Sequence, residues 1–189
     1  MNIKDKILDY LIRNRVSTTE VADVLGKTGV MPDLMPVNRG HYRAGEVKWI
    51  YAYEESNWPI HEQAEHIEDG KIVIVSNFGC GDRAIFGELV AKYILLYKQS
   101  QAIVIDGKMR DAAALIKEKW PIWCNGFNPV GCFNRKPSAP LDEQLLMTTK
   151  EKYDGAIAVC DDCGVVIIPK ERINEELLHG LKHIENQED

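Results

Sequence analysis

Hydrophobic residues along the chain follow two patterns, helical spacing and short continuous runs, which alternate from one end to the other. Spacing of three and four positions at the start of the chain, and again after Pro169, predicts an amphipathic helix at each end. The C-terminal stripe comprises Ile173, Leu177, Leu178, Leu181 and Ile184. Apolar runs rich in β-branched residues predict strands. These runs lie at residues 47–53, 72–75, 102–105, 120–124, 156–160 and 165–168.

Helices are expected between several of these strands. The patterns that predict them lie at residues 60–67, 90–96 (as a buried helix) and 112–117. Ser17 and Glu20 have the spacing of a capping box, which predicts a short helix up to about Gly26. Prolines and glycines predict irregular chain at residues 31–36 and 125–141. The alternation of strands and helices predicts an α/β fold.

Composition limits the class of protein. The 189 residues, 45% apolar and 28% charged, fit a single globular domain over residues 1–189. A net charge of −6 argues against a nucleic-acid partner, because phosphate binding requires a basic surface. No apolar stretch approaches the roughly 20 residues that span a bilayer, and the N-terminus does not resemble a signal peptide. Five cysteines, an odd number, favour reduced thiols, so we expect a cytoplasmic protein without membrane contact.

Two further patterns involve metal-binding residue types. Cys160 and Cys163 form a CxxC motif, which is typical of half a zinc site or of a redox pair. No second close pair completes a zinc site, and the two acidic residues between the cysteines disfavour a thiolate, so a structural role is the favoured interpretation. His179 and His183 are four positions apart on the last helix, where a solvent-facing role is favoured over zinc binding.

Arg110 and Asp111 are the most informative residues of the chain, because a predicted strand ends and a predicted helix begins beside them. Ligands often bind at this end of a strand in α/β proteins. A guanidinium group suits a carboxylate or an enolate oxygen, and a carboxylate suits a divalent cation such as Mg²⁺. The alternative is a surface ion pair with a helix N-cap, and the pair alone does not decide between the two.

A second junction of this kind contains Gly87. Residues 79–91 follow the apolar run 72–75 and lead into the next helical pattern. A glycine at a helix start lets backbone N–H groups approach an anion closely. We therefore expect the two junctions to form one concave site. Its predicted lining comprises Gly87, Glu88, Leu89, Val90, Arg110 and Asp111.

Segments 87–91 and 105–111 resemble, in content and order, the RraA-like family. Two flanking segments support the resemblance: residues 17–26 are similar to its N-terminal Ser-Thr…Asp-Ala-Leu helix, and residues 161–169 to its closing Asp-x-x-Gly-Val-Val-x-x-Pro strand. The likeness covers about residues 17–169, and the predicted C-terminal helix 170–189 follows it. The family contains regulators of ribonuclease E activity and metal-dependent 4-hydroxy-4-methyl-2-oxoglutarate aldolases. The chain resembles a divergent member.

The resemblance implies a swivelling β/β/α sandwich with flanking N- and C-terminal helices, assembled as trimers or dimers of trimers. It also implies roles for the candidate residues. Arg110 would contact the keto or enolate oxygen of the substrate, and Asp111 would hold Mg²⁺ or Mn²⁺. Backbone N–H groups of residues 87–90 would bind the substrate carboxylate. Glu88 would orient a catalytic water, or else serve only as a solvated residue at a helix start.

Ala114 departs from the family pattern. Aldolase members carry an acidic residue at this position, which supports the metal ligands. Loss of such a carboxylate typically costs roughly 10–100-fold in metal affinity or activity.

Two functions remain after these observations. The leading hypothesis is a lyase dependent on Mg²⁺ or Mn²⁺ that cleaves a small 2-oxo acid, by retro-aldol cleavage or decarboxylation through a pyruvate enolate. The alternative is a non-catalytic regulator that binds a ribonuclease or another protein, which the net charge and Ala114 favour. A methyltransferase is not favoured, because residues 79–81 are too short for an adenosylmethionine-binding loop and no acidic ribose ligand follows.

Overall fold

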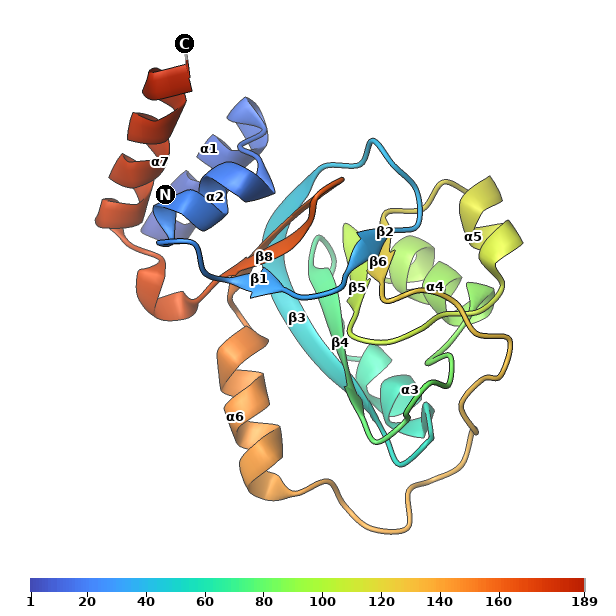
Figure 1. Ribbon diagram of the computed structural model, residues 1–189. Helices are drawn as coiled ribbons and strands as arrows, with labels where there is room; N and C mark the ends of the chain where they lie inside the picture. Colours follow the sequence, from blue (N-terminus) through green and yellow to red (C-terminus); the bar gives the residue numbers. More distant parts are fainter. Residues whose placement is uncertain (189) are drawn as a thin grey trace.

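The computed structural model describes residues 1–188, with side chains for residues 1–184, as one eight-stranded sheet surrounded by helices (Figure 1). The strands are β1 (Val30–Met31), β2 (Met35–Pro36), β3 (Arg43–Tyr53), β4 (Ile72–Phe78), β5 (Ala102–Ile105), β6 (Ile122–Cys124), β7 (Ile157–Asp161) and β8 (Gly164–Ile168). Their order across the sheet is β1-β8-β7-β3-β4-β5-β6-β2. The prediction of an α/β fold is therefore confirmed.

The long strand β3 belongs to both halves of the sheet. Residues 43–46 pair antiparallel with β7, and residues 47–53 pair parallel with β4. β4, β5 and β6 continue the parallel half, whereas β7 and β8 form an antiparallel hairpin. Because the carboxyl ends of parallel strands meet at one edge of a sheet, the loops that follow β4 and β5 lie together.

Helices cover both halves of the sheet (Figure 1). α1 (Ile3–Asn14), α2 (Thr18–Val24) and α7 (Glu175–Glu188) lie over the antiparallel half, where the two ends of the chain meet. The parallel half carries α3 (Trp58–Ala64), α4 (Glu88–Lys92), the π-helix η1 (Tyr93–Tyr97) and α5 (Ala112–Lys117). α6 (Glu143–Tyr153) stands beside β3, and the 3₁₀-helix η2 (Lys170–Arg172) precedes α7. Among residues 1–188, every helix is too short or too polar to cross a membrane.

The core explains why the parallel strands are continuous apolar runs. All side chains of β5, and those of residues 72–75 in β4, are fully buried, because helices or other strands cover both faces. The end helices are amphipathic and bury one stripe each, with Ile7 and Leu11 from α1 and Leu177 and Leu181 from α7. The predicted capping box is present: Ser17 and Glu20 bond to each other's backbone N–H groups at the start of α2.

The prediction of irregular chain at residues 31–36 is wrong in part. β1 and β2 lie at the two ends of this segment and pair with β8 and β6. Strands of two residues are too short to show a period of two, and they exist only because distant strands offer free edges. β3 likewise begins at Arg43 rather than at residue 47, because pairing with β7 extends it.

Two helices also differ from the pattern. α6 lies where no helix was predicted. It lacks a strong apolar stripe, and none of its residues is buried. The helix expected at residues 90–96 is present as α4 and η1, but it is not buried throughout. Leu89 is 82% exposed and Leu96 is 55% exposed, so an apolar face of this helix pair meets solvent.

Candidate functional site

Arg110 and Asp111 lie between the end of β5 and the start of α5. Two backbone hydrogen bonds hold this segment against the chain that precedes α4. Ile85 N–H donates to Lys108 C=O at 2.8 Å, and Arg110 N–H donates to Phe86 C=O at 3.2 Å. The two strand-to-helix junctions therefore run side by side.

The carboxylate of Asp111 touches the start of α4. Its Oδ2 atom accepts a hydrogen bond from Glu88 N–H at 3.0 Å. A Cβ atom at Gly87 would lie 1.9 Å from this oxygen, so the contact requires a glycine there. Asp111 itself has a left-handed backbone, with φ 61° and ψ 35°, a conformation that aspartate tolerates better than most residues. The junction between β5 and α5 and the junction before α4, which the sequence pattern predicted to form one site, therefore lie in contact.

The guanidinium group of Arg110 lies beside the same carboxylate. Arg110 Nε is 3.9 Å from Asp111 Oδ2, and the two side chains are 50% and 45% exposed. A Cβ atom at Gly131 would lie 2.7 Å from Arg110 Nη1, so this glycine makes room for the guanidinium group. Sequence reasoning missed Gly131, because it lies in the irregular segment 125–141 and no local pattern links it to β5.

Arg83 fixes the chain around Gly131. Its Nη1 group donates to Gly131 C=O at 3.1 Å, and its Nε is 3.1 Å from Glu55 Oε1. A backbone bond from Cys132 N–H to Ala84 C=O, at 2.9 Å, continues the same attachment. Segment 125–141 is therefore tied to the turn after β4 and forms a wall next to Arg110.

Two thiols join the same two segments. Cys132 donates a hydrogen bond to Cys80, which lowers the pKa of Cys80 against the opposing effect of burial, and backbone N–H groups of Glu55 and Ser56 lower it further. The same hydrogen bond raises the pKa of Cys132. Both cysteines are free thiols. The two thiols therefore lie where the turn after β4 meets segment 125–141.

The other predicted lining residues differ in their placement. Glu88 and Val90 are partly buried, whereas Leu89 points into solvent. Leu89 belongs to an open depression that Lys92, Tyr93, Leu96 and Tyr97 also line. The side chain of Leu89 therefore belongs to an exposed apolar surface and takes no part in the contact between Glu88 and Asp111.

The donor set around Asp111 is small. Among the residues that the structure describes, no group of three or more His, Cys, Asp or Glu side chains could hold a metal ion. Ala114 supplies no oxygen from the first turn of α5. Mg²⁺ commonly binds through one or two carboxylates and keeps several waters, so a single carboxylate can hold it only when water and substrate complete the shell. Asp111 fits that kind of site.

The CxxC motif and the histidine pair lie elsewhere. Cys160 is buried in β7, and burial raises its pKa, while Cys163 is exposed in the turn before β8. Their side chains therefore lie in different environments. His179 and His183 are both exposed on α7.

Known proteins share this architecture. A family model described as RraA-like, Aldolase/RraA, matches residues 18–167. Protein DlpA of Legionella pneumophila is 24% identical over 175 residues, which cover 89% of this chain and 28% of that protein, so the chain spans only about a quarter of its length. A Halalkalibacterium halodurans protein named "Putative 4-hydroxy-4-methyl-2-oxoglutarate aldolase" is 23% identical over 168 residues, 86% of this chain and 78% of that protein.

A solved structure supports the fold. Streptomyces coelicolor RraAS2, described as an unusual member of the RNase ES inhibitor RraA protein family, matches with a TM-score of 0.73 and 20% identity, over 97% of this chain and 95% of its own. The family model covers most of the chain, including both strand-to-helix junctions. On these grounds the chain is a member of the RraA-like family.

Proposed function

We propose that this protein is a divalent-metal-dependent lyase that cleaves a small 2-oxo acid in the cytoplasm. The observation that carries the proposal is the contact of three groups: the Arg110 guanidinium, the Asp111 carboxylate and the Glu88 N–H. Retro-aldol cleavage or β-decarboxylation of a 2-oxo acid leaves an enolate, whose oxygen gains negative charge in the transition state. A fixed positive charge beside that oxygen lowers the barrier.

Each residue would contribute one part of this chemistry. Arg110 would bind the keto oxygen and stabilise the enolate. Of the backbone N–H groups of residues 87–90, those other than Glu88 N–H, which bonds to Asp111, would hold the substrate carboxylate. Asp111 would hold Mg²⁺ or Mn²⁺, which supplies Lewis-acid polarisation of the carbonyl when bound. Glu88 would orient a water molecule that delivers a proton to the enolate carbon.

A second copy of the chain would complete the site. Arg110 and Asp111 are about half-exposed, which is more open than a site that excludes water. Beside them, Leu89 and Tyr97 expose 82% and 75% of their surface in one apolar face. Such a face is typical of a protein interface. We therefore propose a homo-oligomer, a trimer or a hexamer, in which this face is buried.

The alternative function is a non-catalytic regulator that binds a ribonuclease or another protein. Ala114 favours it, because the position gives no carboxylate to support a metal. The name of the Streptomyces relative concerns inhibition of an RNase. In this case Arg110 and Asp111 would be a surface ion pair, with Asp111 at the N-cap position of α5 but without a side-chain capping bond.

A pyruvate-release assay separates the two functions. Purified protein is incubated with oxaloacetate, or with 4-hydroxy-4-methyl-2-oxoglutarate, with and without Mg²⁺ or Mn²⁺. We expect metal-dependent turnover, which Arg110→Lys and Asp111→Asn each lower by about 100-fold or more, the scale seen when one group that stabilises an oxyanion is removed. Arg39→Lys and Asp69→Asn, on exposed residues elsewhere, are the matched controls and should keep full activity. No turnover with any 2-oxo acid would favour the regulator, whereas turnover that survives both site variants would show that the lyase site lies elsewhere.

A further inference from the structure

The central strand β3 has a free edge over its second half. β7 pairs only with residues 43–46, so residues 47–53 have a strand partner, β4, on one side alone. Alternate residues of a strand direct their backbone groups to opposite sides. On the side away from β4, Val47 N–H donates to Ala156 C=O and Val47 C=O accepts from Gly155 N–H. The backbone N–H and C=O groups of Trp49, Tyr51 and Tyr53 therefore also point to that side.

Most backbone groups on this edge are occupied. Trp49 N–H donates to Asp154 Oδ1 at 2.9 Å, and Tyr51 C=O accepts from Gln63 Nε2 at 3.0 Å. Tyr53 N–H donates to the C=O of Ser56 at 3.1 Å. Trp49 C=O and Tyr51 N–H lie between these bonds, and neither has a hydrogen-bond partner within residues 1–188.

Trp49 C=O and Tyr51 N–H are spaced so that one residue of an added chain could bond to both. In a parallel pair, a residue donates its N–H to one strand position and accepts at its C=O from the position two residues further along. A chain that runs parallel to β3 would satisfy Trp49 C=O and Tyr51 N–H with the N–H and C=O of a single residue opposite Ile50. Free edges of this kind are used to bind extended peptides.

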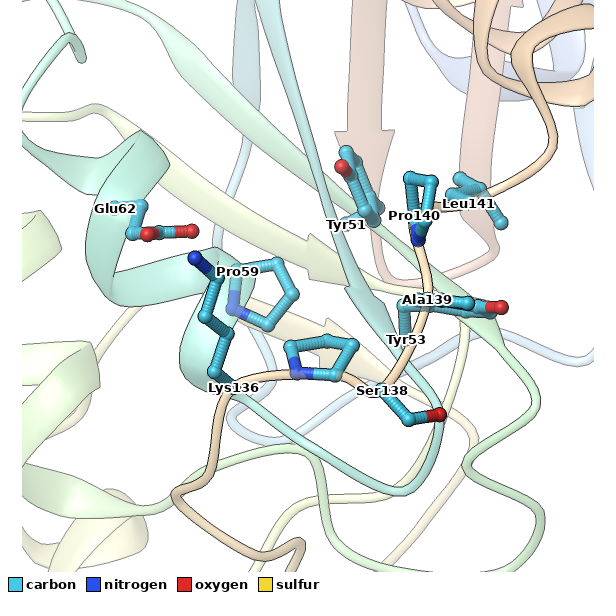
Figure 2. Close-up of a pocket in the computed structure, with 10 residues that line it drawn as sticks. Tyr51, Tyr53, Pro59, Glu62, Lys136, Ser138, Ala139, Pro140 and Leu141 are labelled. Carbon is cyan, nitrogen blue, oxygen red and sulfur yellow. The ribbon is translucent and has the colours of Figure 1, made fainter.

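Cavities on both sides of Tyr51 leave room for such a chain. One cavity of about 280 Å³ lies between α3 and α6, and its lining includes Trp49, Gln63 and Leu146. The other, of about 310 Å³, lies between β3, α3 and the chain at residues 136–141. Figure 2 shows Tyr51 beside Pro140 on one side of this cavity, and Glu62, Pro59 and Lys136 on the other. Tyr51 lines both cavities, so they flank the unpaired groups.

The lining of the first cavity is basic, opposite in sign to the net charge of the whole protein, whereas the second cavity carries one basic and one acidic residue. Lys48, His66 and Lys150 line the first cavity, and no acidic residue does. Lys136 and Glu62 line the second. The chain as a whole has a net charge of −6. A local excess of basic groups in an acidic protein selects for a negatively charged partner.

We propose that the free edge of β3 at Trp49–Tyr51 binds an extended, acidic peptide segment of another protein, which lies parallel to β3 and pairs with it through one residue. Its backbone pairs with Trp49 C=O and Tyr51 N–H, and its acidic side chains contact Lys48 and Lys150. The surface does not involve Arg110 or Asp111, so the proposal does not depend on the proposed lyase activity.

Nuclear magnetic resonance on the full-length, isotope-labelled protein tests this inference. The probe is the capped peptide acetyl-Glu-Val-Glu-Val-Glu-amide, with the sequence acetyl-Lys-Val-Lys-Val-Lys-amide as its charge-reversed control. We expect shifts at residues 48–53 with the acidic peptide, and slower hydrogen exchange of the Tyr51 amide by roughly tenfold or more, because the amide gains a hydrogen bond. The same peptide with N-methylated valines should bind more weakly, since it loses backbone donors.

Variants identify the charge requirement. The pair Lys48→Glu with Lys150→Glu should weaken binding by roughly tenfold or more, because like charges then face each other. If the double Glu variant does not fold, the milder pair Lys48→Gln with Lys150→Gln replaces it. Lys117→Glu on α5, which changes the charge at one site by the same amount, is the control. Equal binding of the two peptides, an unprotected Tyr51 amide, or saturation of the same shifts by succinate would overturn the proposal, the last in favour of a site for small anions.

Discussion

The contact between Gly87 and Asp111 is the feature on which the candidate site depends at the scale of single residues. Asp111 is held by one hydrogen bond from Glu88 N–H, and its carboxylate occupies the space in which a side chain at position 87 would lie. Arg110 is placed in the same way against Gly131. Two glycines therefore leave the space that the two charged side chains occupy.

Gly87→Ala should disturb this contact directly. The new methyl group would lie 1.9 Å from Asp111 Oδ2 and 2.9 Å from Arg110 Cγ, so both side chains must move. We expect loss of metal-dependent turnover and a decrease of about 1–3 kcal/mol in the free energy of unfolding, as for other overpacked sites. Urea unfolding and the pyruvate assay measure the two effects.

A double variant shows whether the clash is the cause. Asp111→Ala removes the oxygen, so in the Gly87→Ala background it should restore part of the lost stability, whereas in the wild-type background it should not stabilise the protein. Additive effects of the two substitutions would contradict the proposed contact.

At the scale of elements, side chains join segments that are distant in the sequence. Glu46 on β3 contacts Lys71, just before β4, at 3.0 Å and Lys4 on α1 at 3.3 Å. Lys4 also donates to Gly155 C=O, just before β7, at 3.0 Å. One carboxylate thus links a helix and the two halves of the sheet at the point where β3 changes partner.

Glu46→Gln should lower stability at neutral pH but not in acid. Burial alone would raise the pKa of Glu46, but hydrogen bonds and charges from Lys71 and Lys4 outweigh it and hold the pKa below its usual value of 4.5. Since the folded-state pKa is the lower one, the stabilisation is present above pH 4.5 and is lost as the pH falls through the folded-state value. We expect a difference of about 0.5–1 kcal/mol at pH 7, because the pair is partly exposed.

Urea unfolding of the variant and of wild type at pH 7 and at pH 3 measures this difference. Glu62→Gln, at an exposed residue in the middle of α3, is the control and should change stability at neither pH. A difference that persists unchanged in acid would show that lost packing, rather than charge, causes the effect.

At the scale of the whole molecule, exposed apolar residues of α4 and η1 lie together on one face. Leu89, Leu96 and Tyr97 are each more than half exposed, and Tyr93 and Tyr97 stack with ring centres 5.0 Å apart. This face adjoins Asp111 through the start of α4. Oligomer formation and the candidate site are therefore coupled by position.

Leu89→Glu combined with Tyr97→Glu should dissociate the proposed oligomer, because burying a charge in an apolar interface is costly. Light scattering at micromolar concentration should give a trimer or hexamer for wild type and a smaller mass for the variant. Ile12→Glu, at a half-exposed apolar residue of α1, is the matched control and should leave the mass unchanged. A monomeric mass for wild type would contradict the proposal.

Local patterns in the sequence determined the class of fold and the proximity of the two junctions. Continuous apolar runs identify buried strands, helical spacing identifies α1 and α7, and the capping box at Ser17 marks the start of α2. Because neighbouring parallel strands end at the same edge, the placement of Gly87 near Asp111 could also be expected from the order of elements.

Tertiary structure decided what depends on partners distant in the sequence. β1 and β2 form on edges offered by β8 and β6, and β3 gains its first residues from β7. Because β7 pairs with β3 only up to residue 46, the edge of β3 at Tyr51 has no strand partner on that side. The folding of segment 125–141 brings Gly131 to Arg110. Periodicity reports which face of a segment is buried, but not what buries it, so these contacts required the folded chain.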